Sequence, residues 1–197
     1  RSCGSLSRHL PRLGTMAALS WLGRLLSNRR AGSSLSIWFV PGLRSERDLT
    51  VSSPSFVDGG VIPQRFAGPG VGENISPALV VSGVPVEASH IVFVLEDTDT
   101  PTSRPLIHTL SILSPDTTSL PEGALDRAAP GVTHLKGDFA TGYSGPRPIP
   151  GHGTHHYGFM LFAVDVDIDT TSWRTALESI EGHVLARGRV VGTYERA

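Results

Sequence analysis

The sequence contains one cysteine, Cys3, among its 197 residues. This near-absence excludes an internal disulfide framework and any cysteine-based metal site. No stretch reaches the roughly 18 consecutive apolar residues that a membrane-spanning helix needs. The phosphate-binding Gly-x-x-x-x-Gly-Lys-Ser/Thr loop, the Gly-x-Ser-x-Gly elbow and the His-Glu-x-x-His zinc helix are absent too. The glycines of "GPGVG" at 68–72 precede "ENISPALV" rather than a helix, so they form no dinucleotide loop.

Acidic residues are missing from residues 1–45, which carry seven arginines. The rest of the chain holds ten basic residues against all 18 acidic ones, so the net charge of −1 conceals a body of net charge −8. Because such a body repels phosphate backbones, we expect no nucleic-acid partner. The asymmetry also divides the chain into a basic N-terminal extension, residues 1–45, and a domain, residues 46–197.

The extension contains the first methionine, Met16, in "MAALSWLGRLLSNRRAGSS", which is typical of a natural start. We therefore interpret residues 1–15 as vector-derived or upstream read-through and leave them out of the fold prediction. A helix over 17–30 would gather four leucines near one face, namely Leu19, Leu22, Leu25 and Leu26. Three interpretations are open: a mitochondrial presequence, a helix on a membrane surface, or a helix that docks its leucines on the domain.

The domain reads as β-rich, with 22 glycines and 15 prolines in the whole chain to supply turns. Its longest apolar stretch, "HIVFVLED" at 90–97, predicts a strand that is buried on both faces. Further strands are expected in "LTVSSPSF" at 49–56, "ALVVSGVP" at 78–85, "LIHTLSIL" at 106–113, "YGFMLFAVDVDI" at 157–168 and "RVVGTY" at 189–194. Helical spacing over 171–186 places Trp173, Leu177, Ile180 and Val184 on one face, with Thr171 or Ser172 as the cap. The order predicts a β-dominated domain with one late helix.

Polar residues stand at the ends of these strands, where a rigid element can deliver them to a pocket. Asp97 and Asp99 follow one strand, and His108 interrupts another. Alternation places His155 and Tyr157 on one face of the next strand and His156 on the other. Each has a plain structural alternative: an Asx-turn for the two aspartates, a carbonyl-bonded buried ring for His108, and a solvated loop for His152, His155 and His156.

The same set of side chains suits two kinds of site. Imidazole N–H and tyrosine O–H groups, with Gly-rich backbone amides, can donate to an oxyanion. Aspartate and histidine are also ordinary ligands of zinc or iron. Spacing alone leaves both open.

The ordered motifs "LEDTDTP", "PLIH", "GYSGPRPIPGHGTHHYGF" and "LFAVD" resemble those of the phosphatidylethanolamine-binding protein family, the Raf kinase inhibitor-like proteins. The likeness covers about residues 49–196, including "ENISP" and the ending "GTYER", which is similar to the short bacterial and archaeal branch. "GRLLSNRRAG" resembles a segment that precedes the domain in actinobacterial-type members, which disfavours mitochondrial import.

The resemblance implies a mainly β fold, a β-sandwich with one or two peripheral helices including the late C-terminal one. It also implies an anion pocket made of seven residues: Asp97, Asp99, His108, Gly145, Pro146, His155 and Tyr157. The sequence departs from the family pattern at Thr98, where a proline is usual, and at His156, where an arginine is usual. Arg147, in the Gly-Pro loop, would return a positive charge.

The function that follows is non-enzymatic binding of a phosphorylated or phospholipid-head-group-like ligand, with regulation of a partner protein. The alternative is a hydrolase or a metal-assisted phosphoryl-transfer enzyme that uses Asp97, His108 and His155. Since no nucleophile stands beside a base in the sequence, binding is favoured over catalysis. We expect no cofactor, no bound metal, no integral membrane span and a cytoplasmic location, and a protein partner or a homodimer remains open.

Overall fold

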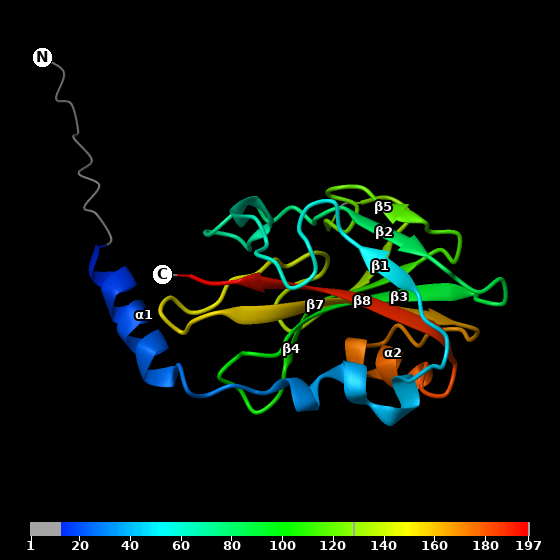
Figure 1. The fold of residues 1–197 in the computed structure, drawn as a ribbon, viewed down its shortest axis with the longest axis horizontal. Coiled ribbons are helices and arrows are strands. Elements are labelled where there is room, and N and C mark those ends of the chain that lie inside the picture. Colours follow the sequence, from blue (N-terminus) through cyan, green and yellow to red (C-terminus); the bar gives the residue numbers. More distant parts are fainter. Residues whose placement is uncertain (1–12, 128, 197) are drawn as a thin grey trace, which may run out of the picture.

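The computed structural model describes residues 13–127 and 129–196, which fold into two antiparallel sheets (Figure 1). The larger sheet has the strand order β6-β4-β3-β7-β8, and the smaller has the order β1-β2-β5. The larger comprises β3 (His90–Asp97), β4 (Leu106–Leu113), β6 (Thr133–Leu135), β7 (His155–Val164) and β8 (Val184–Tyr194). The smaller comprises β1 (Thr50–Ser52), β2 (Leu79–Ser82) and β5 (Ser119–Leu120). The mainly β prediction is confirmed.

Two α-helices occur in the described residues, α1 (Leu13–Leu26) and α2 (Trp173–Ser179). Four short 3-10 turns complete the secondary structure: Ser33–Leu35, Ile37–Phe39, Pro41–Leu43 and Gln64–Phe66. None of the helices seen in the described residues is long and apolar enough to cross a membrane.

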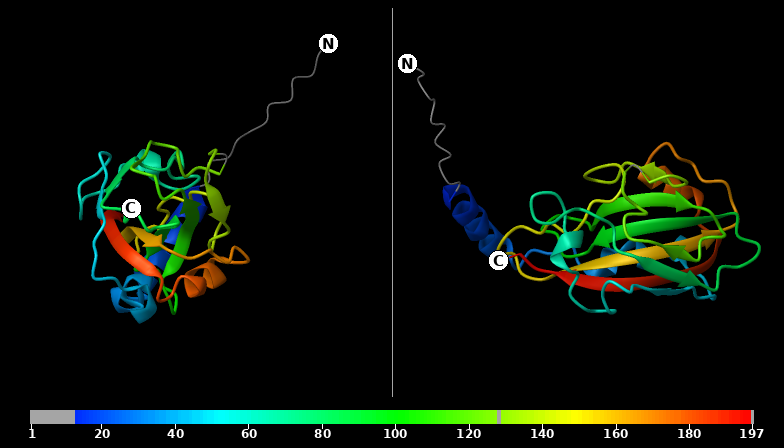
Figure 2. Two further views of the ribbon diagram at one scale, coloured as in Figure 1. Left: turned by 90° about the vertical axis from the view of Figure 1, so that its right-hand side faces the viewer. Right: turned by 90° about the horizontal axis from the view of Figure 1, so that it is seen from above.

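Strand β3 lies at the centre of the larger sheet and is buried on both faces, as its apolar run predicts. Ile91, Phe93 and Leu95 belong to the core between the two sheets. Val92 and Val94 point the other way, into a second core that α2 and the turns at 37–43 cover. Figure 2 shows these layers from the end of the molecule, with the larger sheet in the middle.

The late helix is shorter than the sequence predicts. Ser172 caps it with a hydrogen bond from the Thr175 N–H, as expected, but α2 ends at Ser179 instead of continuing to 186. Val184, predicted on the apolar face of the helix, begins β8, where it pairs with Val164. The prediction was wrong because the β-branched residues of "RVVGTY" extend their pairing with β7 back to Val184, and tertiary pairing overrides local helical spacing. The first strand is also shorter, and β7 begins two residues earlier than expected.

Helix α1 projects from one end of the body, beside the loop that leads into β7 (Figures 1 and 2). Of the three open interpretations, docking of all four leucines on the domain does not describe this helix, since Leu25 stays 64% exposed and Leu26 is only half-buried. The buried contact is Gly23, where a Cβ would collide with the carbonyl oxygen of Pro150. Backbone to backbone packing of this kind requires glycine. The helix also ends at Leu26, four residues before its expected end at Arg30.

Candidate functional site

The antiparallel pairing of β3 and β7 brings Asp97 and His155 to the same edge of the larger sheet. Asp97 ends β3 and lies opposite Tyr157 in the register, and His155 opens β7. The neighbouring strand β4 contributes His108, which follows Ile107 at the position where the β3–β4 register shifts. Three polar side chains that are 58 residues apart or less in sequence thus converge at one sheet edge.

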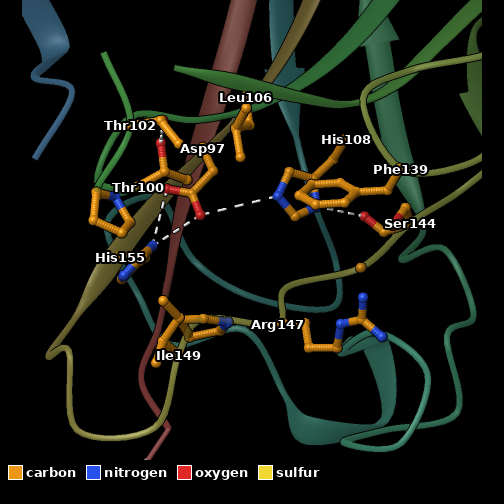
Figure 3. A pocket seen from close by; sticks show the side chains of 13 residues that line it. Asp97, Thr100, Thr102, Leu106, His108, Phe139, Ser144, Arg147, Ile149 and His155 are labelled. Carbon is orange, nitrogen blue, oxygen red and sulfur yellow. Dashed lines mark hydrogen bonds and ion pairs between the residues drawn. The ribbon is translucent and has the colours of Figure 1, made fainter. Parts of the chain in front are cut away.

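A cavity of about 230 Å³ opens at this edge, and four of the predicted residues line it: Asp97, His108, Gly145 and His155. Arg147 lies at its rim, and Thr100 and Thr102 add hydroxyl groups. Apolar walls come from Leu106, Phe139, Pro148 and Ile149. Figure 3 shows the Asp97 carboxylate between the imidazoles of His155 and His108. The volume is small against the roughly 300–1,000 Å³ of drug-sized sites, which fits a small polar group.

The other three predicted residues do not line this cavity. Tyr157 is buried beneath it, with its ring against those of His108 and His155 at centroid distances of 5.4 and 6.3 Å. Burial raises the pKa of Tyr157 well above its usual value, and the nearby Asp97 carboxylate adds to this effect. The hydroxyl is therefore protonated, and it lies near the Asp97 carboxylate without a well-formed hydrogen bond to any described group. Pro146 shapes the loop, where its carbonyl oxygen accepts from the Gly68 N–H.

Asp99 does not line the cavity and instead joins the N-terminal extension to β7. It accepts a hydrogen bond from Arg30 at 2.6 Å and contacts the His156 ring at 2.8 Å. Burial alone would raise the pKa of Asp99, but the hydrogen bonds from His156 and Arg30 outweigh it and lower the pKa. His156, with its side chain 55% exposed, thus lies on the opposite face of β7 from His155, as alternation predicts.

The Asp97 carboxylate is held from two sides. Its Oδ1 accepts the Asp99 N–H at 2.9 Å, which is the Asx-turn expected as the structural alternative. The His155 Nδ1 lies 2.8 Å from Oδ2. The His108 Nε2 is 3.9 Å from the same Oδ2, too far for a hydrogen bond. Asp97 therefore both forms the Asx-turn and lines the cavity.

Sequence reasoning missed His152 as a member of this cluster. Its ring is fully buried, so the solvated-loop alternative was wrong for it, as it was for His155. The His152 Nδ1 lies 2.7 Å from the His155 Nε2, and its Nε2 lies 2.9 Å from the Leu26 carbonyl oxygen. The Arg29 carbonyl oxygen is a second acceptor, 3.1 Å away. The sequence around His152 does not indicate that the ring is buried, because two of its partners, Leu26 and Arg29, belong to the N-terminal extension.

These contacts fix the number of protons that Asp97, His155 and His152 share. The bond to the carbonyls requires a proton on the His152 Nε2, because a carbonyl can only accept. The His152–His155 and His155–Asp97 bonds each need one more. Two neutral imidazoles and one carboxylate would hold two protons in total, and the three bonds hold three. The cluster is therefore neutral overall. Burial lowers the pKa of His152, and His155 has a partner at each ring nitrogen, so we place the extra proton within the His155–Asp97 pair.

His108 is neutral by a separate argument. Its Nδ1 lies 2.9 Å from the Ser144 carbonyl oxygen, so Nδ1 carries a proton and donates it. Burial lowers the pKa of His108, and the attraction of Asp97 only partly offsets this. The Nε2 of the neutral ring then presents a lone pair toward Asp97. His108 is thus both the buried, carbonyl-bonded histidine and a lining residue of the cavity.

The segment after α1 packs against the loops that surround the site. Arg30 donates to the Thr154 carbonyl oxygen at 2.7 Å as well as to Asp99. The N–H groups of Ala31 and Gly32 donate to the carbonyl oxygens of Thr100 and Thr98 at 2.8 and 3.0 Å. The basic extension is therefore packed against the loops that follow β3 and precede β7, and no pattern in its sequence indicates this role.

The chain is similar in sequence to one protein family and to several of its members. Residues 52–195 match the family model described as Phosphatidylethanolamine-binding protein. The UPF0098 protein of Methanothermobacter thermautotrophicus is 36% identical over 154 residues, which are 75% of this chain and 99% of that protein. The lipoprotein LppC of Mycobacterium tuberculosis is 31% identical over 150 residues, which are 75% of this chain and 72% of that protein.

Two crystal structures have the same fold. The phosphatidylethanolamine-binding protein homologue CT736 of Chlamydia trachomatis has 30% identity and a TM-score of 0.67, and the match covers 77% of this chain and 100% of that one. YbcL of E. coli, described as a member of the mammalian PEBP family, has a TM-score of 0.69 over 76% of this chain and 99% of its own. At 24% identity, this second likeness concerns the fold alone.

Proposed function

Because the chain belongs to the phosphatidylethanolamine-binding protein family, we propose that it is a binding module that holds a small phosphate-bearing ligand in the cavity at Asp97, His108 and His155. Family membership supports ligand binding in general. That the ligand bears a phosphate group is our own inference, and it depends on the charge of the cavity.

The observation that carries the proposal is a surplus of one positive charge. The Asp97–His155–His152 cluster is neutral overall, and His108 is neutral. Arg147 then remains as a permanent cation at the rim, and among the described residues no carboxylate lies within ion-pair distance of it. Its guanidinium makes one weak contact, 3.4 Å to the Pro69 carbonyl oxygen. A cationic, partly enclosed site of this size suits a small anion.

The enzymatic alternative has less support. Catalysis by a nucleophile requires a hydroxyl or thiol within hydrogen-bonding reach of a base. In the described part of the cavity, the Thr100 and Thr102 hydroxyls bond to each other at 2.7 Å and to the Arg104 carbonyl oxygen. Ser144 also lines the cavity, but it contacts the His108 ring through its carbonyl oxygen, and no described hydroxyl there bonds to an imidazole. The described residues also contain no group of three side chains suited to hold a metal ion. Binding is the function that these contacts favour.

The test is calorimetric titration of methyl phosphate into the protein. Replacement of Arg147 by Gln removes the unpaired cation and should weaken binding about ten- to a hundredfold, which corresponds to the roughly 1.5–3 kcal/mol of a charge-assisted hydrogen bond. Arg174→Gln, on α2 and outside the cavity, is the matched control and should bind as the wild type does. Absence of measurable heat with the wild-type protein at millimolar ligand would overturn the proposal.

The location and partners are part of the same proposal. We propose a cytoplasmic protein that regulates a partner or a second copy of itself through the ligand-bound state. No observation of this molecule favours one protein partner over another. Cell fractionation checks the location, and recovery of the protein in the membrane fraction would contradict it, in line with the lipoprotein name of one relative.

A further inference from the structure

Two hydrogen-bond acceptors face each other across the cavity. Asp97 Oδ2 and the His108 Nε2 lie 3.9 Å apart, and both side chains line the cavity. The proton of the neutral His108 ring is on the other nitrogen, where it is donated to the Ser144 carbonyl oxygen at 2.9 Å. Two lone pairs at this separation repel each other unless a donor comes between or beside them. The unbound pocket therefore has a place for a proton donor as well as for a negative charge.

In the described structure, no hydrogen bond from a side chain of the pocket fills the space between these two acceptors. His155 uses both ring nitrogens, one toward Asp97 at 2.8 Å and one toward His152 at 2.7 Å. The Gly145 N–H, which a phosphate could otherwise use, donates to the Asn74 side chain at 2.9 Å. Two internal sources remain. One is a proton on the His108 Nε2, which burial opposes by lowering the pKa of that ring, and the other is the Tyr157 hydroxyl, which lies buried beneath the cavity rather than in it.

We propose that the pocket binds phosphate in its singly protonated form, with the ligand O–H donating to Asp97, and that it rejects anions that have no proton to donate. This inference rests on the proposed function and makes it specific. Asp97 is the residue that sets the specificity, while Arg147 attracts the charge. Singly protonated phosphomonoesters and inorganic phosphate share this chemistry. Sulfate and phosphodiesters do not, since their oxygens are acceptors only at neutral pH.

The selectivity follows from an unfavourable contact as well as a favourable one. A sulfate oxygen placed against Oδ2 would leave a buried carboxylate facing another acceptor, with like charges in contact. A site built to accept a ligand hydroxyl rejects an analogue without it far more strongly than a merely apolar pocket could. We therefore expect methyl phosphate to bind at least about tenfold more tightly than sulfate or dimethyl phosphate at pH 6.

Other ionisable groups surround Asp97, and the experiment must separate their titration from that of the ligand. His155, His108 and Tyr157 pack around its carboxylate, and His152 lies behind His155. Glu96 and Asp99 flank Asp97 in the sequence and do not line the cavity. The free protein starts each titration with the same set of these groups. A change of ligand at constant protein therefore isolates the proton of the ligand.

The first experiment is calorimetric titration of the wild-type protein with methyl phosphate, inorganic sulfate and dimethyl phosphate at pH 6. Tight binding of methyl phosphate alone supports the inference. Equal binding of all three would overturn it and leave the proposed function standing. Binding of none would overturn the proposed function and, with it, this inference.

The second experiment follows affinity against pH for methyl phosphate and for methylphosphonate, whose second pKa is higher. A phosphomonoester loses its second proton near pH 6, so its affinity should fall above that pH. For methylphosphonate the fall should begin at a higher pH. Identical curves for the two ligands would mean that protein groups alone set the pH dependence, and the inference would be wrong. This comparison needs no variant and so does not depend on a mutant that folds.

The variant Asp97→Asn supplies the third measurement. An amide can donate as well as accept, so the preference for methyl phosphate over sulfate should shrink by about tenfold. Asp165→Asn, an exposed carboxyl that contacts His183, is the control and should keep the wild-type preference. An unchanged preference in folded Asp97→Asn would assign the selectivity to another residue and contradict the inference.

Discussion

Replacement of His152 by alanine should destabilise the whole protein, although His152 lies in a loop. Its ring is fully buried and joins the His155 Nε2, at 2.7 Å, to the carbonyl oxygens that follow α1. Alanine would leave the His155 N–H and the Arg29 carbonyl oxygen without this partner, while the Leu26 carbonyl oxygen would still accept from the Arg29 N–H at 2.8 Å. Each buried polar group left unpaired costs about 1–3 kcal/mol. Because water can enter the space, we expect a loss of about 2–4 kcal/mol in the free energy of unfolding.

That loss corresponds to a fall of roughly 4–16 °C in Tm, given about 2–4 °C per kcal/mol for a chain of this size. Urea unfolding followed by tryptophan fluorescence measures the free energy. Trypsin cleavage after Arg29 and Arg30 reports on the segment itself and should be faster in the variant. His183→Ala, whose ring is half exposed beside Asp165, is the control. A His152→Ala protein as stable as this control would refute the assignment of His152 as the link between α1 and the pocket.

Three further results are expected. Burial lowers the pKa of both His108 and His152, so these two rings bind protons more weakly in the folded state than in the unfolded state. The stability that they contribute is therefore present above about pH 6.5 and is lost as the pH falls below it. Urea unfolding at pH 7.5 and 5.5 measures this difference, and greater stability at pH 5.5 would contradict it. Gly23→Val should detach α1, since the side chain would meet the Pro150 carbonyl oxygen, and faster tryptic cleavage after Arg24 should follow, whereas the exposed Leu25→Val should cleave as the wild type does. Deletion of residues 1–15 should leave Tm unchanged, because the described contacts of α1 with the body lie at Leu19 and beyond; a fall of several degrees would show that the deleted residues pack on the domain.

The parts of the fold that the sequence predicts are those with strong local patterns. The apolar run at 90–97 is buried on both faces as expected, and alternation in β7 separates His155 from His156 correctly. Where two patterns compete, the prediction fails. Val184 satisfies a helical spacing but pairs in β8, because the neighbouring strand β7 is long enough to extend the sheet.

Of the site, the sequence predicts the residue types better than their partners. Asp97, His108, Gly145 and His155 do line one cavity, whereas Asp99 turns away to contact Arg30, 69 residues earlier in the chain. His152 is tied to Leu26 across 126 residues. Contacts at such separations depend on how α1 packs, and no spacing within a motif encodes them.

NMR of the histidine rings during titration with methyl phosphate tests whether the ligand binds in this cavity. The ring resonances of His108 and His155 should shift with saturation, because both line the cavity, while those of the exposed His156 should stay in place. The resonances of His152 should move less than those of His155, since its ring contacts the ligand only through its neighbour. Shifts at His156 without shifts at His108 and His155 would place the ligand elsewhere and contradict the assignment of this cavity as the binding site.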